Sequence, residues 1–222
     1  GYKSRKARHL PGLCLQSEAL IHIESALFSM YNEDDFDAKD TVEGRQKDMR
    51  KVEDYIKAIP DFPEKGIIFR DVTTVLQDAE GFQLAIDKLQ ELLEGVEFDV
   101  LAGTESRGFL FGAPIAYNLK KPFVLVRKKG KLPRETVSKE YDLEYGTAVI
   151  EMHKDSIQPG QKVVLVDDLI ATGGTVEAAA KLIEELGGEV VKMIFLIELA
   201  GLEGRKKLQQ YDVGSVVVYE GK

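Results

Sequence analysis

The sequence has little that would tie it to an oxidising compartment, a membrane or a nucleic acid. Cys14 is its one cysteine, so the chain can form no internal disulfide and offers no thiol cluster for a metal. No apolar run approaches the roughly 20 residues that cross a bilayer. A formal net charge of −8 argues against a broad basic surface for nucleic acid. We therefore expect a cytoplasmic protein with neither a membrane nor a nucleic-acid partner.

Two common nucleotide-binding motifs and spaced metal ligands are also missing. The sequence contains no G-x-x-x-x-G-K-[ST] loop and no G-x-G-x-x-G fingerprint, which argues against a nucleoside triphosphatase and a dinucleotide-binding domain. Its three histidines, His9, His22 and His153, lack the spacing of metal ligands. We assign them no chemistry.

The residues that are present divide the chain into two parts. The first 48 run from a basic start through a mixed apolar stretch to an acid-rich tract, and the first residue is Gly rather than Met. We expect residues 1–48 to be an N-terminal extension, disordered or loosely packed and possibly non-native. Met49 opens the part with regular patterning, so we expect one domain over 49–222.

Apolar helical periodicity and β-branched runs alternate along that domain. Helices are predicted at 51–59, 81–95, 109–118 and 175–187, and strands at 98–103, 121–128, 147–153, 161–168 and 189–199. The alternation indicates an α/β fold, a mainly parallel open sheet flanked by helices. Between them, residues 130–146 are polar and without periodicity, which is typical of a functional lid loop.

The stretch VVLVDDLIATGGT, residues 163–175, places two kinds of binding group at one strand end. Its Gly-rich second half can turn backbone N–H groups toward a phosphate at the start of the next helix. Asp167 and Asp168 would repel a phosphate, but adjacent carboxylates can accept hydrogen bonds from a vicinal diol. A ribose 5-phosphate satisfies both halves. A turn that merely joins strand to helix would not require these acids and threonines.

This stretch resembles the phosphoribosyl-diphosphate (PRPP) signature of the type I phosphoribosyltransferases. Five further segments are similar to the adenine phosphoribosyltransferase family, in the family's order: FPEKGIIFRDVT (62–73), AGTESRGFLFG (102–112), VRKKGKLP (126–133), YDLEYG (141–146) and IELAGLEGR (197–205). The resemblance implies the type I fold with a small hood and a flexible lid loop. It also implies transfer of the 5-phosphoribosyl group from PRPP to N9 of adenine, giving AMP and diphosphate in purine salvage, by a homodimer. Mg²⁺ would be the cofactor, held through PRPP and water rather than by direct protein ligands.

The resemblance also assigns roles around PRPP. Asp167 and Asp168 would hold the ribose hydroxyls and face the positive charge that develops on the ring. The residues of the 5-phosphate site would be Ala171, Thr172, Gly173, Gly174 and Thr175. Ser106 and Arg107 would meet the diphosphate in a loop where the family often has a cis peptide. Arg127 and Lys131 would approach the diphosphate too, within the subunit or across a dimer. Their neighbours Lys128 and Lys129 stay unassigned.

The remaining roles concern the base and the lid. By resemblance, Glu144 interacts with the adenine ring nitrogens and aids proton removal, and Tyr145 packs over the closed site. Phe69 would stack on adenine, the backbones of Ile68 and Arg70 would read its edge, and Leu199 would close the other face.

Three alternatives stay open. A 6-oxopurine or orotate phosphoribosyltransferase shares the PRPP signature, although the IIFRD and LEYG segments favour adenine. A non-catalytic PRPP-sensing regulator would need a nucleic-acid-binding element, and the N-terminal region has no basic recognition helix. A structural protein on an old enzyme fold would not need the lid acid or the arginines.

Overall fold

The computed structural model describes residues 50–142 and 146–221, so the predicted extension lies outside the described residues. Its elements, in chain order, are η2 (Val52–Tyr55), β1 (Lys57–Pro60), β2 (Ile68–Asp71), α2 (Thr73–Leu76), α3 (Ala79–Glu91), β3 (Val100–Thr104), α4 (Arg107–Leu119), β4 (Phe123–Lys128), β5 (Thr136–Asp142), β6 (Thr147–His153), β7 (Lys162–Ile170), α5 (Gly174–Glu185), β8 (Glu189–Leu199), η3 (Ala200–Leu202), η4 (Gly204–Leu208) and β9 (Val213–Tyr219).

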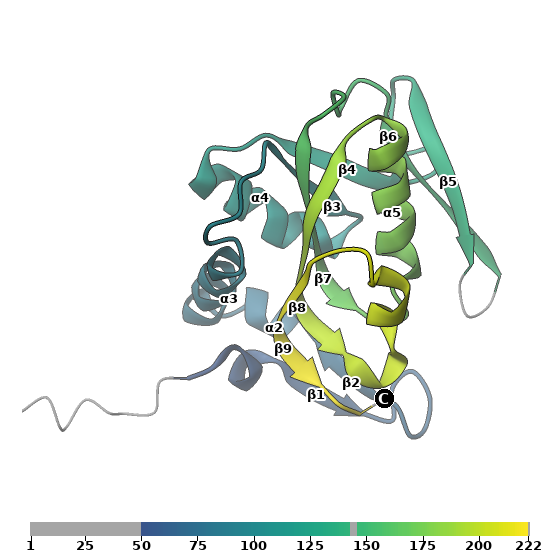
Figure 1. The fold of residues 1–222 in the computed structure, drawn as a ribbon. Helices are drawn as coiled ribbons and strands as arrows, with labels where there is room; N and C mark the ends of the chain where they lie inside the picture. Colours follow the sequence, from purple (N-terminus) through teal and green to yellow (C-terminus); the bar gives the residue numbers. More distant parts are fainter. Residues whose placement is uncertain (1–49, 143–145, 222) are drawn as a thin grey trace, which may run out of the picture. The chain divides into compact units, whose positions relative to one another are not determined.

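A seven-stranded sheet, in the order β5-β6-β4-β3-β7-β8-β9, organises this part of the chain (Figure 1). The strands from β4 through β3, β7 and β8 to β9 pair in parallel, whereas β6 pairs antiparallel with both β4 and β5. This is the mainly parallel sheet that the sequence predicted. A separate antiparallel pair, β1–β2, corresponds to the small hood.

Helices cover both faces of the sheet, which explains why its central strands are apolar throughout (Figure 1). On one face α3 and α4 pack through Leu89, Phe111 and Ile115, all fully buried. On the other, α5 packs through Ala179, Leu182 and Ile183. Residues 163–166 of β7 lie between these two layers with no exposed surface. The strand that carries the Asp pair is therefore fixed from both sides.

The main strands and helices lie where the periodicity predicted them. The strands β6 and β8 have the predicted bounds, and α3, α4 and α5 fall within a few residues of theirs. The strand β7 is longer than predicted, because it continues through Asp167 and Asp168 to Ile170 and pairs with β8 over that length. No helix among the described residues is both long and apolar enough to cross a membrane.

Three segments differ from the sequence prediction. The helix predicted over 51–59 is wrong: only a 3₁₀ turn forms, and Lys57–Pro60 is a strand paired with β2. Part of the predicted lid, Thr136–Asp142, is the strand β5, which pairs with β6 along its whole length. The edge strand β9 was not predicted. In each case pairing with another strand outweighs a weak local pattern.

Candidate active site

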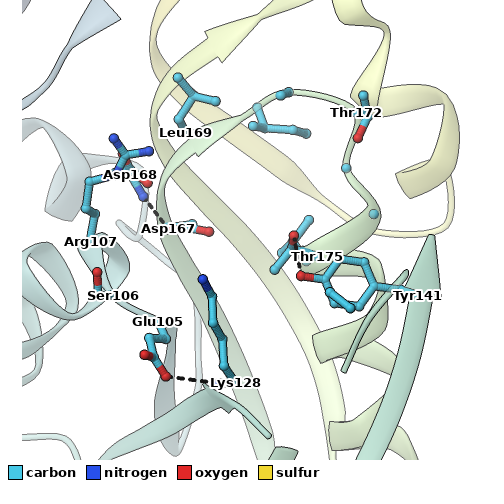
Figure 2. Close-up of a pocket in the computed structure, with 16 residues that line it drawn as sticks. Glu105, Ser106, Arg107, Lys128, Tyr141, Asp167, Asp168, Leu169, Thr172 and Thr175 are labelled. Atoms are coloured by element: carbon cyan, nitrogen blue, oxygen red, sulfur yellow. Dashed lines mark hydrogen bonds and ion pairs between the residues drawn. The ribbon is translucent and has the colours of Figure 1, made fainter. Parts of the chain in front are cut away.

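A cavity of about 380 Å³ opens at the carboxyl ends of β3 and β7 (Figure 2). The N-termini of α4 and α5 lie beside it, because each helix follows one of these strands. This is the edge at which open α/β sheets bind ligands. The cavity is lined by Glu105, Ser106, Arg107, Lys128, Tyr141, Ala148 and residues 167–176.

The two aspartates of β7 have strongly perturbed carboxyl groups. Asp168 is 4% exposed, and its Oδ2 lies 2.8 Å from Nε of Arg107. Burial raises its pKa, and the Arg107 charge opposes that rise. Asp167 is partly exposed as a residue, but its carboxyl group is enclosed, and burial followed by repulsion from Asp168 raises its pKa well above the ordinary value. The pair is therefore a candidate for chemistry rather than for stabilising the fold.

The phosphate loop, residues 171–175, lines the cavity next to this pair. Gly173 has φ +78°, a left-handed conformation that favours glycine, and α5 begins at Gly174. The hydroxyl of Thr175 donates a hydrogen bond of 3.2 Å to the Tyr141 hydroxyl, so β5 contacts the loop (Figure 2). The helix start and the loop together form a site suited to a phosphate.

The segment from Glu105 to Arg107 forms the opposite wall. The Glu105–Ser106 peptide bond is cis, as the resemblance implied. The Glu105 carboxylate accepts the Lys128 N–H at 2.9 Å and Nε of Arg127 at 3.1 Å. Burial, the largest single influence, would raise the Glu105 pKa, but these donors together hold it below its ordinary value. Glu105 thus joins the end of β3 to the end of β4.

The basic run after β4 is arranged differently from the prediction. Lys128 lines the cavity, and its side chain extends into it (Figure 2). Arg127 and Lys131 do not line it. The Arg127 guanidinium contacts Glu105 and donates to the Lys131 carbonyl oxygen at 3.2 Å, while the Lys131 N–H donates to Glu151. Their roles toward diphosphate stay predictions.

The predicted base-binding residues are not among the residues that line the cavity. Phe69 packs edge-to-face on Phe62, with ring centroids 5.3 Å apart. The Arg70 guanidinium stacks 3.9 Å from the centre of the Tyr219 ring, and Leu199 pairs with Tyr219 across β8 and β9. Ile68 is exposed on the same hairpin. Arg70 and Leu199, far apart in the sequence, thus meet around one tyrosine.

The β1–β2 hairpin, which carries Ile68, Phe69 and Arg70, is close enough to Arg107 of the cavity for charges to interact. Hydrogen bonds from Thr73, and then the Arg107 charge, lower the pKa of Asp71. The base-binding roles remain predictions on this arrangement. Glu144 and Tyr145 lie outside the described residues.

Sequence reasoning missed three lining residues with polar side chains: Glu105, Lys128 and Tyr141. Glu105 directly precedes the predicted Ser106. Lys128 is next to Lys129 in a basic run, and nothing in the sequence assigned a role to either lysine. Tyr141 stood in a segment taken as lid. In the sequence, these three residues could have been found only by their closeness to predicted residues. The pairing of β4, β5 and β6 shows which of the side chains reach the cavity.

Comparison with known proteins gives a consistent result. The phosphoribosyl transferase domain family matches residues 71–219. An adenine phosphoribosyltransferase of Agathobacter rectalis is 74% identical over 174 residues, covering 78% of this chain and 100% of the relative. The crystal structure of adenine phosphoribosyltransferase from Thermoanaerobacter pseudethanolicus is similar with a TM-score of 0.73 and 57% identity, covering 76% of this chain and 98% of that one. The structure of the Saccharomyces cerevisiae enzyme, solved with an imino-altritol bisphosphate and adenine, is similar with a TM-score of 0.70 and 40% identity. The match covers 74% of this chain and 96% of that one.

Proposed function

The chain belongs to the adenine phosphoribosyltransferase family, and we propose that it transfers the 5-phosphoribosyl group of PRPP to N9 of adenine, giving AMP and diphosphate. One observation carries this proposal: the phosphate loop and the Asp167–Asp168 pair share a cavity with Arg107 and Lys128. A loop for one phosphate, acceptors for a diol and cations for a diphosphate are the three parts that PRPP requires.

In this reaction, the bond from the ribose C1 to the diphosphate oxygen breaks while the bond from C1 to N9 forms. Positive charge develops on the ribose ring in between. Asp167 and Asp168 accept the ribose hydroxyls and place negative charge beside the ring, which favours the transition state over the ground state. The loop from Ala171 to Thr175 holds the 5-phosphate through backbone N–H groups and the start of α5.

The leaving diphosphate meets the opposite wall. Arg107, at the first position of α4, and the Ser106 backbone bind it, and Lys128 adds a point charge from the end of β4. Arg127 and Lys131 contribute from the turn behind Lys128. Adenine lies against Phe69, between the backbones of Ile68 and Arg70 and the side chain of Leu199. Glu144 takes the proton that N9 loses, and Tyr145 covers the site.

The described residues contain no cluster of three or more His, Cys, Asp or Glu side chains that could hold a metal ion. We propose that Mg²⁺ is bound with PRPP, through substrate oxygens and water. Bound there, it supplies charge neutralisation for the departing diphosphate.

The functional unit is residues 49–222. The matched length of the Agathobacter rectalis relative, 174 residues, equals the length of this segment and supports the boundary. Deleting residues 1–48 should leave turnover within a few-fold of the full chain. A severe loss would show that the extension completes the fold or the assembly.

Three exposed apolar side chains support the homodimer. Leu110 and Tyr117 lie two turns apart on α4 and are 45% and 85% exposed, and Leu125 of β4 is 37% exposed. A second copy of the chain would cover them. Sedimentation of Tyr117→Glu against the unmodified protein tests this, and an unchanged dimer would place the interface elsewhere. The cytoplasmic location rests on the single cysteine, Cys14, and is likewise a proposal.

Initial rates with PRPP and Mg²⁺ against adenine, hypoxanthine, guanine and orotate, measured in parallel, test the function. We expect AMP from adenine and little product from the other bases. Turnover with another base would keep the PRPP site and discard the roles given to Phe69 and Glu144. Tight PRPP binding without turnover of any base would favour a PRPP-sensing regulator.

A further inference from the structure

The outer side of the phosphate loop rests on the start of η4 through main-chain contact. A Cβ atom at Gly204 would overlap the carbonyl oxygen of Ala171 and lie 2.9 Å from Cγ1 of Ile170. In the other direction, a Cβ atom at Gly173 would lie 2.8 Å from the carbonyl oxygen of Gly204. Because no side chain separates the two segments, a shift of η4 moves the loop directly.

An ion pair between a half-exposed arginine, Arg205, and a buried carboxylate, Glu198, holds η4 in this place. Arg205, which follows Gly204, donates from Nε and Nη2 to the two carboxylate oxygens of Glu198, both at 2.7 Å. Its Nη1 donates to the carbonyl oxygen of Val213 at 2.9 Å. Glu198 is 6% exposed and also accepts the Ser215 hydroxyl at 2.7 Å. This bidentate geometry fixes direction as well as distance.

The anchor of the pair belongs to the same strands as the site. Glu198 lies near the end of β8, where it pairs with Ile170, the residue before the phosphate loop. On its other side it pairs with Val218 of β9. The ion pair therefore joins η4 to the end of β8. This end of β8 lies beside Ile170 of β7, where the phosphate loop begins.

We infer that Arg205 is a positioning residue for the 5-phosphate: by holding Gly204 against Ala171 and Gly173, it fixes the N–H groups of the phosphate loop in their binding geometry. The inference rests on the proposed function, since it concerns the same PRPP site. It predicts a selective effect. The loop side of the cavity depends on Arg205, while the diphosphate side, built on Arg107 and Lys128, does not.

Arg205→Met tests the inference by calorimetric titration with two ligands, ribose 5-phosphate and Mg-diphosphate. We expect the dissociation constant of ribose 5-phosphate to rise about tenfold, because small misplacements of a binding group weaken it strongly. The constant for diphosphate should change less than about twofold. In steady state, KM for PRPP should rise while KM for adenine stays unchanged. Arg205→Lys should recover only part of the loss, since an ammonium cannot replace the fork of two hydrogen bonds.

Two further variants separate positioning from general stability. Gly204→Ala leaves the ion pair intact but forces its Cβ against the Ala171 carbonyl, so it should weaken ribose 5-phosphate selectively even if Arg205→Met folds poorly. Lys206→Met is the matched control, because Lys206 is exposed and contacts only Glu203 among the described ion pairs. It should leave both dissociation constants unchanged.

Each outcome decides the inference. Selective loss of ribose 5-phosphate affinity in Arg205→Met and Gly204→Ala supports it. Unchanged affinities with a lower melting temperature, or equal weakening of both ligands, would overturn it and leave Arg205 a stabilising residue. Failure of the unmodified protein to bind ribose 5-phosphate would instead overturn the proposed function.

Discussion

The carboxyl ends of β7 and β8 are neighbours in the sheet. Both carry a buried carboxylate, and the pKa values of the two carboxylates are shifted in opposite directions. On β7, Oδ2 of Asp168 forms an ion pair with Arg107 but has no hydrogen-bond partner among the described residues, and burial raises the pKa. On β8, Glu198 receives two hydrogen bonds from Arg205 and one from Ser215, which outweigh burial and lower its pKa.

The difference separates a carboxylate kept for a ligand from one used for architecture. Burying an acid without enough donors costs free energy, so we expect Asp167 and Asp168 to destabilise the unliganded fold, and in the proposed function the ribose hydroxyls supply the donors. Both oxygens of Glu198 are already engaged, because the carboxylate accepts two hydrogen bonds from Arg205 and one from Ser215. In the proposed function, the same chemical group thus binds the ligand on β7 and supports the loop through Arg205 on β8.

The largest effect that can test this comparison is on turnover. Asp168→Asn keeps the shape of the side chain but removes the charge beside the ribose ring. We expect kcat to fall about 10²- to 10³-fold, the usual cost of losing one electrostatic partner of the transition state, while circular dichroism stays unchanged. Asp155→Asn, at an exposed ion pair with Arg134, serves as the control. Unchanged kinetics would show that Asp168 does not bind the ribose hydroxyls.

An intermediate effect is expected on stability at β8. Glu198→Gln replaces charged hydrogen bonds to Arg205 and should lower the free energy of unfolding by about 2 kcal/mol at neutral pH. Because the folded pKa of Glu198 is lowered, its contribution is present above the ordinary glutamate pKa and is lost as the pH falls through the folded value. Thermal melts of both proteins across this acidic range should therefore converge. Glu203→Gln, at an exposed pair with Lys206, should change little.

The smallest effect has the opposite sign. The folded pKa of Asp167 is raised, so the contribution of this one group to the stability of the unliganded protein is most favourable below the ordinary aspartate pKa and declines as the pH rises through the folded value. Asp167→Asn removes the buried charge and should stabilise the protein by about 1 kcal/mol at neutral pH, the scale of one poorly satisfied buried polar group. Melting curves should show the gain shrinking toward acidic pH. A loss of stability at neutral pH would make Asp167 a structural acid like Glu198.

The sequence predicted the parts of the molecule in which local pattern and tertiary environment agree. The strands β6 and β8 are mostly apolar, β-branched segments, so their bounds could be predicted from the local pattern. The segment 51–59 failed because its helical spacing is short and Lys57–Pro60 instead pairs with β2. The lid prediction overlooked β5, whose polar residues form a strand only because β6 lies beside them.

For the site, the sequence by itself determined which groups stand at the end of β7: an acid pair and a Gly-rich phosphate loop within nine residues. Contiguous residues keep their spacing in any fold, so such a motif can be read directly. Only the tertiary structure decided that Lys128 rather than Arg127 lines the cavity, and that Glu198 and Arg205 support the loop from behind. Those contacts join separate strand ends, and their geometry comes from sheet order and pairing, which no local stretch of sequence encodes.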